Sequence, residues 1–487
     1  MVDDLVVKYP RARITGTLTC ESTLHVGDGG LIPFSERGGR ASGKEGPYNT
    51  VCIDADGSCY LPASTLRGFL RAASDDTALV ARLFGPADAR RSGKVRVYDA
   101  YRDEAQSGTE ETRPYWHVTR GTSVRHGIAI DAVTGVVDRH KLFRHELVPS
   151  GTRFRASIEA DRVSHGDLQA LLRLLYRWDG GEAAAIGKGK GRGQGRLRWD
   201  LERVVVLTEE KLRAWLRSEA PLDAAFFERI EAPEKPVVSE TRLVFRICPT
   251  APLLPNEIGF VRKKEHDDDH PPGLEFSRLP DGRPCIPAGS LRGMVRARAR
   301  RILMTLVHDR VAAEPANRLA DGLIDRLFGS IERRGRLWFN DAESLAPGSA
   351  HPQFFNAVDR FTGGVTEKKL YNVNAVLCDE LRFTVTFDPE TPNLAGDGDW
   401  CKGLLLLVLR DSMEGDLAIG WGKARGYGAF CLKVTNESGA DLDSWAACLR
   451  DLRCRWCSDR WIKALRDKVA QTLSDCRKHE LERAAQP

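Results

Sequence analysis

The amino-acid sequence predicts an α+β protein built from two copies of one domain in tandem. A glycine-rich motif occurs twice, as IGKGKGRGQGR at 186–196 and as IGWGKARGYGA at 419–429, with glycines, lysines and arginines in register. Strand-like and helix-like segments precede both motifs in the same order. The offset between matched residues drifts slowly, as loop insertions would make it, so we infer a duplicated unit of about 200 residues. The matched pairs include Arg67 with Arg292, Gly135 with Gly363, and Gly187 with Gly420.

Length and composition indicate an ordinary globular protein. The 487 residues suffice for two or three domains, and 42% hydrophobic with 29% charged residues is typical of such chains. The net charge of +5 is mild, so a nucleic-acid site must be a local concentration of cations. The longest apolar run, 403–409, is too short to cross a bilayer, and the acidic N-terminus lacks the cations of a signal peptide. Twelve cysteines are better explained as reduced thiols, so we expect a cytoplasmic protein without a membrane partner.

The first copy opens with a strand and continues into a helix. Residues 12–21 alternate apolar with other residues, as strands do. LPASTLRGFLRAA at 61–73 starts a helix in which Ser64 or Thr65 can cap the N-terminus. The helical pattern continues until a Gly-Pro pair at 85–86 stops it.

The second copy repeats this helix as IPAGSLRGMVRARAR at 286–300, with Ser290 as its expected cap. The apolar face is the same, but Arg292, Arg296 and further arginines add a basic face. That face is either simply solvated or lies against phosphates, which the positive N-terminal end of the helix would favour.

Further elements recur between the helix and the glycine motif. VRVYDA at 95–100 matches LWFNDA at 337–342, and each predicts a strand. Segments 128–143 and 356–371 both contain an aspartate, a Thr-Gly turn and a terminal aromatic residue. The predicted organisation is a first domain at 1–230, a linker at 231–240, a second domain at 241–440 and a helical tail at 441–487.

The glycine motif has the chemistry of a polyanion site. Alternating glycines lack Cβ atoms and tolerate positive φ, so the backbone can lie against a phosphodiester chain. Lys188, Lys190 and Arg192 add charge without an acidic residue among them. The alternative is a flexible, solvated hairpin, which the repetition disfavours. A nucleotide-binding enzyme is disfavoured because neither copy has the G-x-x-x-x-G-K-S/T pattern.

Together, these features resemble the RAMP superfamily of CRISPR-associated proteins, in particular the repeated backbone subunit of type III effector complexes. The resemblance is carried by LHVGDGG at 24–30, which is clear only in the first copy, and by three motifs present twice. These are the P-x-S-S/T-L-R/K-G helix start, the D-x-x-T-G segment and the G-x-G-K-x-R-G-x-G loop. Two copies in one chain are similar to the fused-subunit variants of type III systems.

The resemblance implies two tandem RRM-like, ferredoxin-like β-α-β-β-α-β domains with hairpin insertions. In the family the glycine loop and first helix hold the guide RNA backbone, and the D-x-x-T-G hairpin wedges into the guide–target duplex. Base-stacking aromatics of the RRM kind are not evident, so we expect recognition of the backbone, nearly independent of sequence. The matched positions are Ser64, Arg67, Lys190, Arg192, Ser290, Arg292, Lys423 and Arg425, to which Lys188 and Arg296 are added for their charge.

The resemblance also implies a catalytic aspartate in the loop between the first strand and the helix. In the second copy this loop contains EHDDDH, so Asp267, Asp268 or Asp269 would hold a divalent metal, Mg²⁺ or Mn²⁺. The metal would support cleavage of target RNA, in which the neighbouring 2′-hydroxyl attacks the phosphate. The corresponding loop of the first copy, 31–49, has no aspartate, so we expect that copy to be inactive.

The predicted function is that of a guide CRISPR RNA-binding backbone subunit that meets target RNA and other type III subunits, with cleavage by the second domain. One alternative is a structural subunit in which the aspartates are part of a charged loop without catalytic function. Another is a metal-free guide-processing ribonuclease using His126, His140 and His145. The spacing of Cys454 and Cys457 also suits zinc, although buried thiols on helices explain it equally simply.

Overall fold

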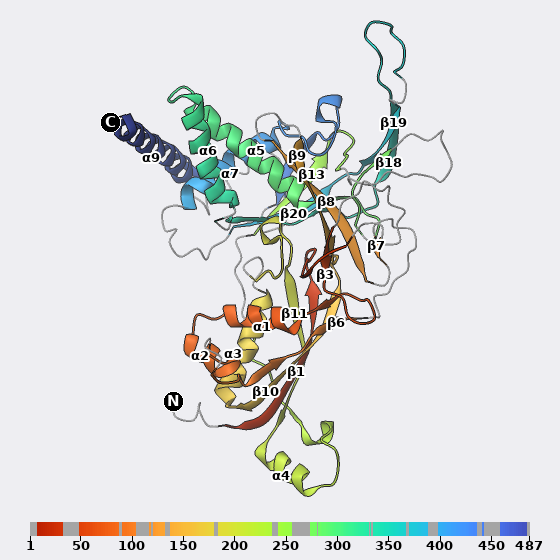
Figure 1. Cartoon of the computed structure of the whole chain (residues 1–487), viewed down its shortest axis with the longest axis vertical. Helices are drawn as coiled ribbons and strands as arrows, with labels where there is room; N and C mark the ends of the chain where they lie inside the picture. The colour runs from red at the N-terminus through yellow and green to blue at the C-terminus, as the bar shows by residue number, and fades with distance from the viewer. Residues whose placement is uncertain are drawn as a thin grey trace. The chain divides into compact units, whose positions relative to one another are not determined.

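The computed structural model contains two compact units (Figure 1). One comprises Met1–Arg125, Arg144–Lys190 and Gln194–Glu240, and the other His126–Phe143, Gly191–Gly193 and Thr241–Pro487. The residues described are 7–32, 48–86, 90–103, 116–117, 120–131, 137–179, 184–235, 242–255, 273–279, 281–330, 332, 335–366, 370–387, 398–435, 441–442 and 458–484.

The first unit is built on an antiparallel sheet in the order β11-β1-β10, with β5 and β6 both pairing with β10. Along the chain these are the fourth, first, third and second strands, which is the ferredoxin-like arrangement. Helices follow the first and third strands, as the predicted β-α-β-β-α-β order requires. The elements are β1 (Tyr9–Cys20), α1 (Ala63–Ala72), α2 (Thr77–Phe84), β5 (Val95–Val97), β6 (Ala100–Arg102), β10 (Arg153–Val163), α3 (His165–Leu175) and β11 (Leu197–Leu207).

The second unit repeats this arrangement in the order β21-β13-β20, with β16 and β17 both pairing with β20. The predicted duplication of a ferredoxin-like domain is therefore confirmed at the level of strand order. Its elements are β13 (Arg242–Pro249), α5 (Ala288–Val307), α6 (Ala313–Phe328), β16 (Leu337–Phe339), β17 (Ala342–Ser344), β20 (Leu381–Phe387), α7 (Gly398–Met413) and β21 (Phe430–Thr435).

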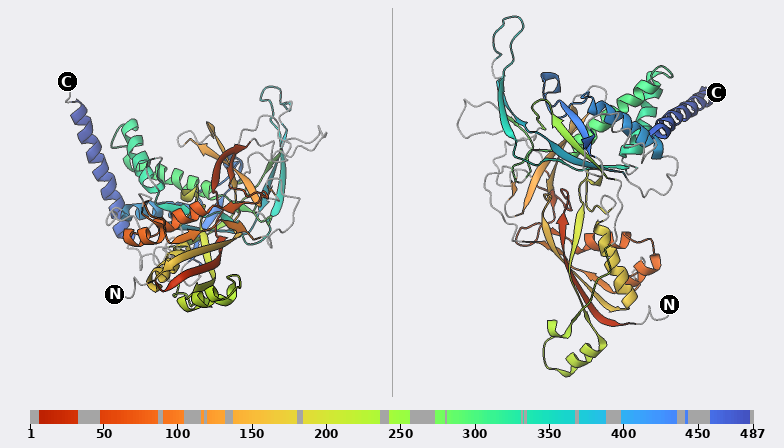
Figure 2. Two further views of the ribbon diagram at one scale, coloured as in Figure 1. Left: turned by 60° about the horizontal axis from the view of Figure 1, so that its bottom comes forward. Right: turned by 180° about the vertical axis from the view of Figure 1, so that it is seen from behind.

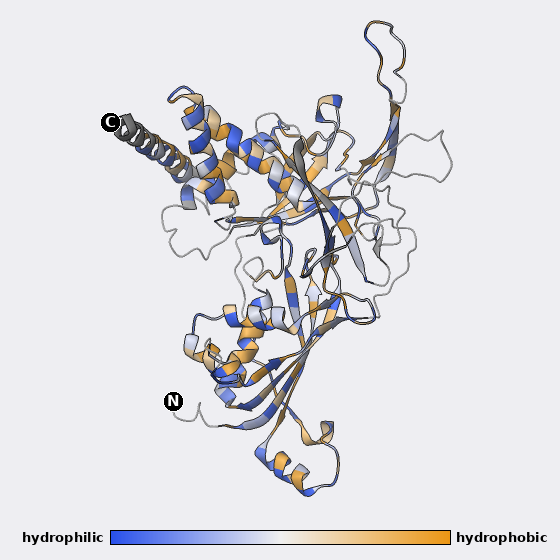
Figure 3. Cartoon of the chain, in the orientation of Figure 1, coloured by the Kyte–Doolittle hydropathy of each residue, from blue (hydrophilic) through white to orange (hydrophobic). Residues whose placement is uncertain are grey.

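Alternating burial along β1 explains why this segment is the central strand of its sheet. Ile14 and Leu18 are fully buried, and Gly16 lies beneath the indole of Trp199. A Cβ at Gly16 would lie 2.5 Å from that ring, so a larger residue would displace the tryptophan. In the second unit, hydrophilic and apolar residues alternate around α5 and α6 (Figure 3), and their apolar faces, including Leu303 and Leu323, are buried.

Hairpins and short strands are inserted around each core. The hairpin β8–β9 and the hairpin β18–β19 occupy the same position, between the second and third core strands. Their bounds are β8 (Thr122–Ile130), β9 (Val137–Leu147), β18 (Ser349–Phe355) and β19 (Tyr371–Leu377). The remaining strands and helix are β2 (Gly27–Ile32), β3 (Tyr48–Val51), β4 (Tyr60–Leu61), β7 (Trp116–His117), α4 (Glu209–Arg217), β12 (Glu228–Arg229), β14 (Gly273–Glu275), β15 (Cys285–Ile286) and β22 (Asp441–Leu442).

The predicted C-terminal tail contains one long helix, α9 (Ser458–Ala484), which packs on α7 in the same unit (Figure 2). Trp461 and Leu465 are buried in that contact. A Cβ at Gly403 would lie 2.4 Å from the carbonyl oxygen of Trp461, so the two helices approach closely at this glycine. Among the helices of the described ranges, none combines the length and apolar character that crossing a membrane requires.

The helix starts differ from the sequence prediction. Pro62 and Pro287 are the N-caps, and neither of these N-cap residues accepts a hydrogen bond through its own side chain. Ser64, Thr65 and Ser290 therefore do not cap, because α1 and α5 begin before them. The single helix predicted between 61 and 84 is two helices, since Asp76 starts α2 by accepting hydrogen bonds from Ala78 and Leu79.

Candidate nucleic-acid interface

An aspartate between two short strands, β5 and β6 in one copy and β16 and β17 in the other, fixes the start of the first helix. Asp99 Oδ1 accepts a hydrogen bond from the backbone N–H of Ala63 at 2.6 Å, and Asp341 Oδ1 accepts one from Ala288 at 2.8 Å. Each carboxylate satisfies an otherwise unpaired donor and lies at the positive end of the helix. This capping role was not predicted from the sequence, although the Asp-Ala pair that ends both matched segments, 95–100 and 337–342, is a signal of it.

We expect Asp99→Ala and Asp341→Ala each to lower the free energy of unfolding by about 1 kcal/mol, because each removes a helix cap. Urea denaturation followed by circular dichroism measures this change. Asp99→Asn keeps an acceptor oxygen and serves as the matched control. Equal stability of the alanine variant and the wild type would contradict the capping role.

The glycine motifs form loops that are closed by identical backbone hydrogen bonds. In the first copy the N–H of Ile186 donates to Gly195, that of Gly195 to Thr23, and that of Lys188 to His25, at 2.8 to 2.9 Å. The second copy repeats each bond at the matched positions and over the same range of distances. The matched donors and acceptors are Ile419 to Gly428, Gly428 to Pro252, and Trp421 to Leu254.

Four of the glycines are required by this closure. A Cβ at Gly187 would lie 2.2 Å from the carbonyl oxygen of His25, and one at Gly420 would lie 2.4 Å from that of Leu254. Gly195 and Gly428 face the carbonyls of their own loops just as closely. These glycines therefore allow close approach of the backbone of their own domain, whereas the sequence predicts that their lack of Cβ atoms serves the approach of a phosphodiester chain.

The tips of both loops present cations to solvent. Lys190–Arg192 and Lys423–Arg425 each form one turn of 3-10 helix. Lys190 and Lys423 are exposed, and so are the adjacent Lys188 in the first copy and Arg425 in the second. These four predicted phosphate contacts are therefore accessible, whereas Arg192 is half-buried.

In the first unit the glycine loop lines a groove of about 440 Å³ together with the glycines of β2 and the start of α1. Lys188 and Thr65 face this groove, as does the buried His25. The glycine loop and the first helix, which are predicted to hold the guide backbone, thus meet at one place beside the β2 glycines. Asp28 shapes the groove by accepting hydrogen bonds from the Thr50 hydroxyl and the backbone N–H of Gly30, both at 2.7 Å.

The helix arginines that were expected to contact RNA have internal partners. Arg67 donates to the carbonyl oxygen of Phe84, the last residue of α2, and Arg292 donates to that of Phe328, the last residue of α6. Each guanidinium thereby satisfies a carbonyl at the negative end of a helix. Burial lowers the pKa of Arg292 to about 10. Arg296 forms an ion pair with Asp325 at 2.9 Å.

The arginine at each loop tip stacks on an aromatic residue in the second strand of an inserted hairpin. The guanidinium carbon of Arg192 lies 4.4 Å from the ring centroid of Phe143, and that of Arg425 lies 5.9 Å from Tyr371. Phe143 and Tyr371 are the matched terminal aromatics of the two duplicated segments. Burial lowers the pKa of Arg192, whereas Arg425 is exposed and also stacks on Trp421 at 5.0 Å.

Comparison with protein families agrees with this internal repetition. The family model of the RAMP superfamily matches residues 17–198 and 273–431, one region in each copy and together more than half of the chain. The chain belongs to the RAMP superfamily. No curated protein matches it. As a tandem RAMP protein, it has a CRISPR-associated, RNA-binding role.

The D-x-x-T-G motif of this RAMP protein forms a turn at the tip of the β18–β19 hairpin. Asp359 Oδ1 accepts hydrogen bonds from the backbone N–H groups of Phe361 at 2.9 Å and Thr362 at 2.8 Å. Gly363 adopts φ +68°, which favours glycine. The turn holds Phe361 with 99% of its surface exposed. Residues 132–136, the matched tip in the first copy, lie outside the described residues.

This turn should loosen in acid. Hydrogen bonds from Thr362 and Phe361 lower the pKa of Asp359, so the turn is stabilised above the ordinary pKa of an aspartate and loses that stabilisation as pH falls through the lowered value. Backbone amide chemical shifts of Thr362 and Phe361, followed by NMR between neutral and strongly acidic pH, would report the transition. In Asp359→Asn, which cannot titrate there, the acid transition should be absent, and its persistence would contradict this assignment.

Several predicted residues lie outside the described ones. They include the candidate catalytic and metal-binding Asp267, Asp268 and Asp269, the pair Cys454 and Cys457, and the side chains of His126 and His140. Their roles therefore stay predictions. His145 is described, and its Nδ1 lies 3.3 Å from the side-chain nitrogen of Asn49 near the groove.

An acidic cluster in the second unit is bridged by an arginine. Asp411, Glu414 and Asp416 bring oxygen atoms close enough to hold an ion. However, Arg298 pairs with Asp411 at 2.6 Å and with Asp416 at 3.2 Å. A cation would have to displace this guanidinium, so the cluster is better explained as an ion-pair network between α5 and the end of α7.

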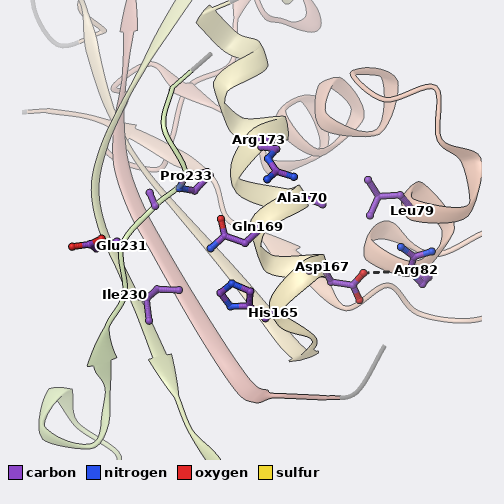
Figure 4. Close-up of a pocket in the computed structure, with 12 residues that line it drawn as sticks. Leu79, Arg82, His165, Asp167, Gln169, Ala170, Arg173, Ile230, Glu231 and Pro233 are labelled. Atoms are coloured by element: carbon purple, nitrogen blue, oxygen red, sulfur yellow. Dashed lines mark hydrogen bonds and ion pairs between the residues drawn. The ribbon is translucent and has the colours of Figure 1, made fainter. Parts of the chain in front are cut away.

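A larger groove of about 970 Å³ in the first unit lies between α2, α3 and residues 230–233 (Figure 4). Arg82 reaches across to Asp167 at 3.2 Å, and Lys94 reaches the same carboxylate at 3.1 Å. His165 faces the groove and bonds Tyr9 at 3.1 Å. The groove shares none of its lining residues with the groove at the glycine loop.

Proposed function

We propose that this RAMP protein is a guide RNA-binding backbone subunit of a type III CRISPR ribonucleoprotein, in which its two domains occupy two consecutive positions along the guide. The proposal rests on one structural arrangement that occurs in both copies. Each copy has a glycine loop closed by the same hydrogen bonds, with a cationic tip beside a strand of an inserted hairpin. A single site would suit a small phosphate, whereas two matched sites in one chain suit a polymer of phosphates.

The loops and helix starts have distinct roles in this proposal. Lys188, Lys190 and Lys423 neutralise guide phosphates, and the exposed hydroxyls of Ser64 and Ser290 donate to phosphate oxygens at the starts of α1 and α5. Arg67, Arg292 and Arg296 contribute positive potential while holding the helices together. Because these contacts address the backbone, binding should depend weakly on guide sequence and strongly on salt.

The second domain is proposed to cleave target RNA. Asp267, Asp268 and Asp269 supply three adjacent carboxylates, the oxygen ligands that Mg²⁺ or Mn²⁺ prefers. A bound divalent ion would neutralise charge on the scissile phosphate and favour the leaving oxygen. The protein's own part is to hold the target strand there, and the exposed Phe361 would separate its bases from the guide. We place this activity in the cytoplasm, where other type III subunits would assemble on the same guide.

A metal-free guide-processing ribonuclease is the second candidate, and one observation favours it. The rings of His25 and His145 lie 5.5 Å apart beside the glycine-loop groove, where one could act as base and the other as acid. Chelation separates the candidates, because target cleavage should stop with EDTA whereas histidine-dependent processing of repeat RNA should continue.

Purification from native cells, followed by sequencing of the bound nucleic acid, tests the main proposal. We expect short RNAs that share one end and differ elsewhere, together with other subunits. Recovery of the protein alone and free of RNA would overturn the ribonucleoprotein assignment and favour the processing nuclease.

A further inference from the structure

The glycine loop of the second copy carries an aromatic cluster, defined by Phe355, Tyr371, Trp421 and Tyr427. Phe355 and Tyr371 stack with ring centroids 5.5 Å apart, and Trp421 meets Tyr427 edge to face at 5.7 Å. Trp421 also lies edge-on to Phe355 at 6.0 Å and to Tyr371 at 6.3 Å. The cluster therefore joins the β18–β19 hairpin to the glycine loop.

The first copy has a different composition at the same places. Lys188 occupies the position of Trp421, and Gln194 occupies that of Tyr427. The backbone hydrogen bond made at this position is nevertheless the same, since Lys188 donates to His25 at 2.9 Å and Trp421 donates to Leu254 at 2.8 Å. Closure of the loop consequently does not require an aromatic side chain.

The cluster is accessible and lies among cations. Phe355, Tyr371 and Trp421 are half-buried rather than enclosed, and Lys423 and Arg425 beside them are exposed. The Arg425 guanidinium lies within 6 Å of the centroids of all three rings. Planar cations and aromatic faces that adjoin in this way are the surfaces on which unpaired bases stack in single-stranded RNA complexes.

We propose that the second-copy loop holds an unpaired nucleobase by stacking on Trp421 beside Arg425, whereas the first-copy loop holds a phosphate with Lys188. This inference rests on the proposed RNA binding. It assigns different parts of the RNA to two loops whose backbones otherwise match. It also revises the expectation that recognition uses the backbone alone. Stacking is tolerant of base identity, so the site distinguishes a base from no base rather than one base from another.

The test compares Trp421→Lys, Trp421→Phe and wild type in the full chain. Lysine is the residue that the first copy carries at this position, and phenylalanine retains an aromatic face. The probes are a single-stranded RNA oligonucleotide and an abasic oligonucleotide of equal length and charge, and affinity is measured by fluorescence anisotropy at several salt concentrations. The reciprocal variant Lys188→Trp serves as a gain-of-function comparison.

We expect Trp421→Lys to lose about 5- to 100-fold in affinity for the RNA but not for the abasic probe, and its salt slope to steepen by about one phosphate contact. Trp421→Phe should retain most of the RNA affinity, and Lys188→Trp should increase the preference for RNA over the abasic strand. Equal losses for both probes, or no loss for either, would overturn the stacking site while leaving RNA binding intact. Wild-type protein that binds neither probe would instead overturn the RNA-binding function on which the site rests.

Discussion

Gly420→Ala will destabilise this RAMP protein by at least about 2 kcal/mol and weaken RNA binding by the second domain. Gly420 adopts φ +90°, and an added Cβ would lie 2.4 Å from the backbone oxygen of Leu254. An alanine is strained in this left-handed conformation. Its Cβ must also push the two backbone segments apart, which breaks the hydrogen bond from Trp421 to Leu254. Gly187→Ala should act in the same way on the first loop.

The chain offers a matched control for this substitution. A Cβ at Gly191 would meet open space, and alanine already occupies the equivalent position, Ala424, in the second copy. Gly191→Ala should leave stability and RNA affinity unchanged. Chemical denaturation and filter binding measure both properties. If Gly420→Ala were as stable as Gly191→Ala, loop closure by close backbone approach would be refuted.

Replacing Asp267, Asp268 and Asp269 together by asparagine should reduce cleavage of target RNA by at least about 100-fold in the assembled complex. Charge stabilisation by a divalent ion is worth several kcal/mol at the transition state, and neutral amides hold such an ion weakly. Guide binding should be unchanged, because the matched loops and helix starts remain. Single variants would then identify the essential carboxylate.

Cleavage assays with excess Mg²⁺ or Mn²⁺ and with EDTA provide the comparison. Wild type should stop cutting in EDTA, and the triple variant should cut poorly under all conditions. The acidic residues of the first-copy loop, Glu36 and Glu45, serve as controls, since their replacement by glutamine should not alter cutting. Undiminished cleavage by the triple variant would exclude the second-copy loop as the catalytic site.

Self-comparison of the sequence was sufficient to predict the architecture. The duplication is predicted by the similar offsets between Arg67 and Arg292 and between Gly187 and Gly420. The alternation of apolar residues predicts a strand at 12–21, which is the central strand of the first sheet. Such features depend on residues that are near one another in the chain. They are therefore visible without knowledge of tertiary contacts.

The details of the candidate site depend on contacts across long sequence separations. Asp99 caps a helix that begins at Ala63, and Gly187 is constrained by the carbonyl oxygen of His25. The partner residues Asp99 and His25 cannot be identified from the sequence near Ala63 or Gly187. The aromatic cluster was missed for the same reason, because Phe355 and Trp421 become neighbours only when the β18–β19 hairpin meets the glycine loop.

The pairing of β1 also determines when the protein can fold during synthesis. Ile14, near the start of the chain, pairs with Ile158 of β10 and with Val204 of β11. The first sheet therefore cannot be completed until residue 204 has left the ribosome, and nascent β1 must wait with unpaired edges. The second sheet has the same delay, because Val244 of β13 pairs with Thr435 of β21. Long-range pairing of this kind folds slowly, so each half should need protection from aggregation late in its own translation.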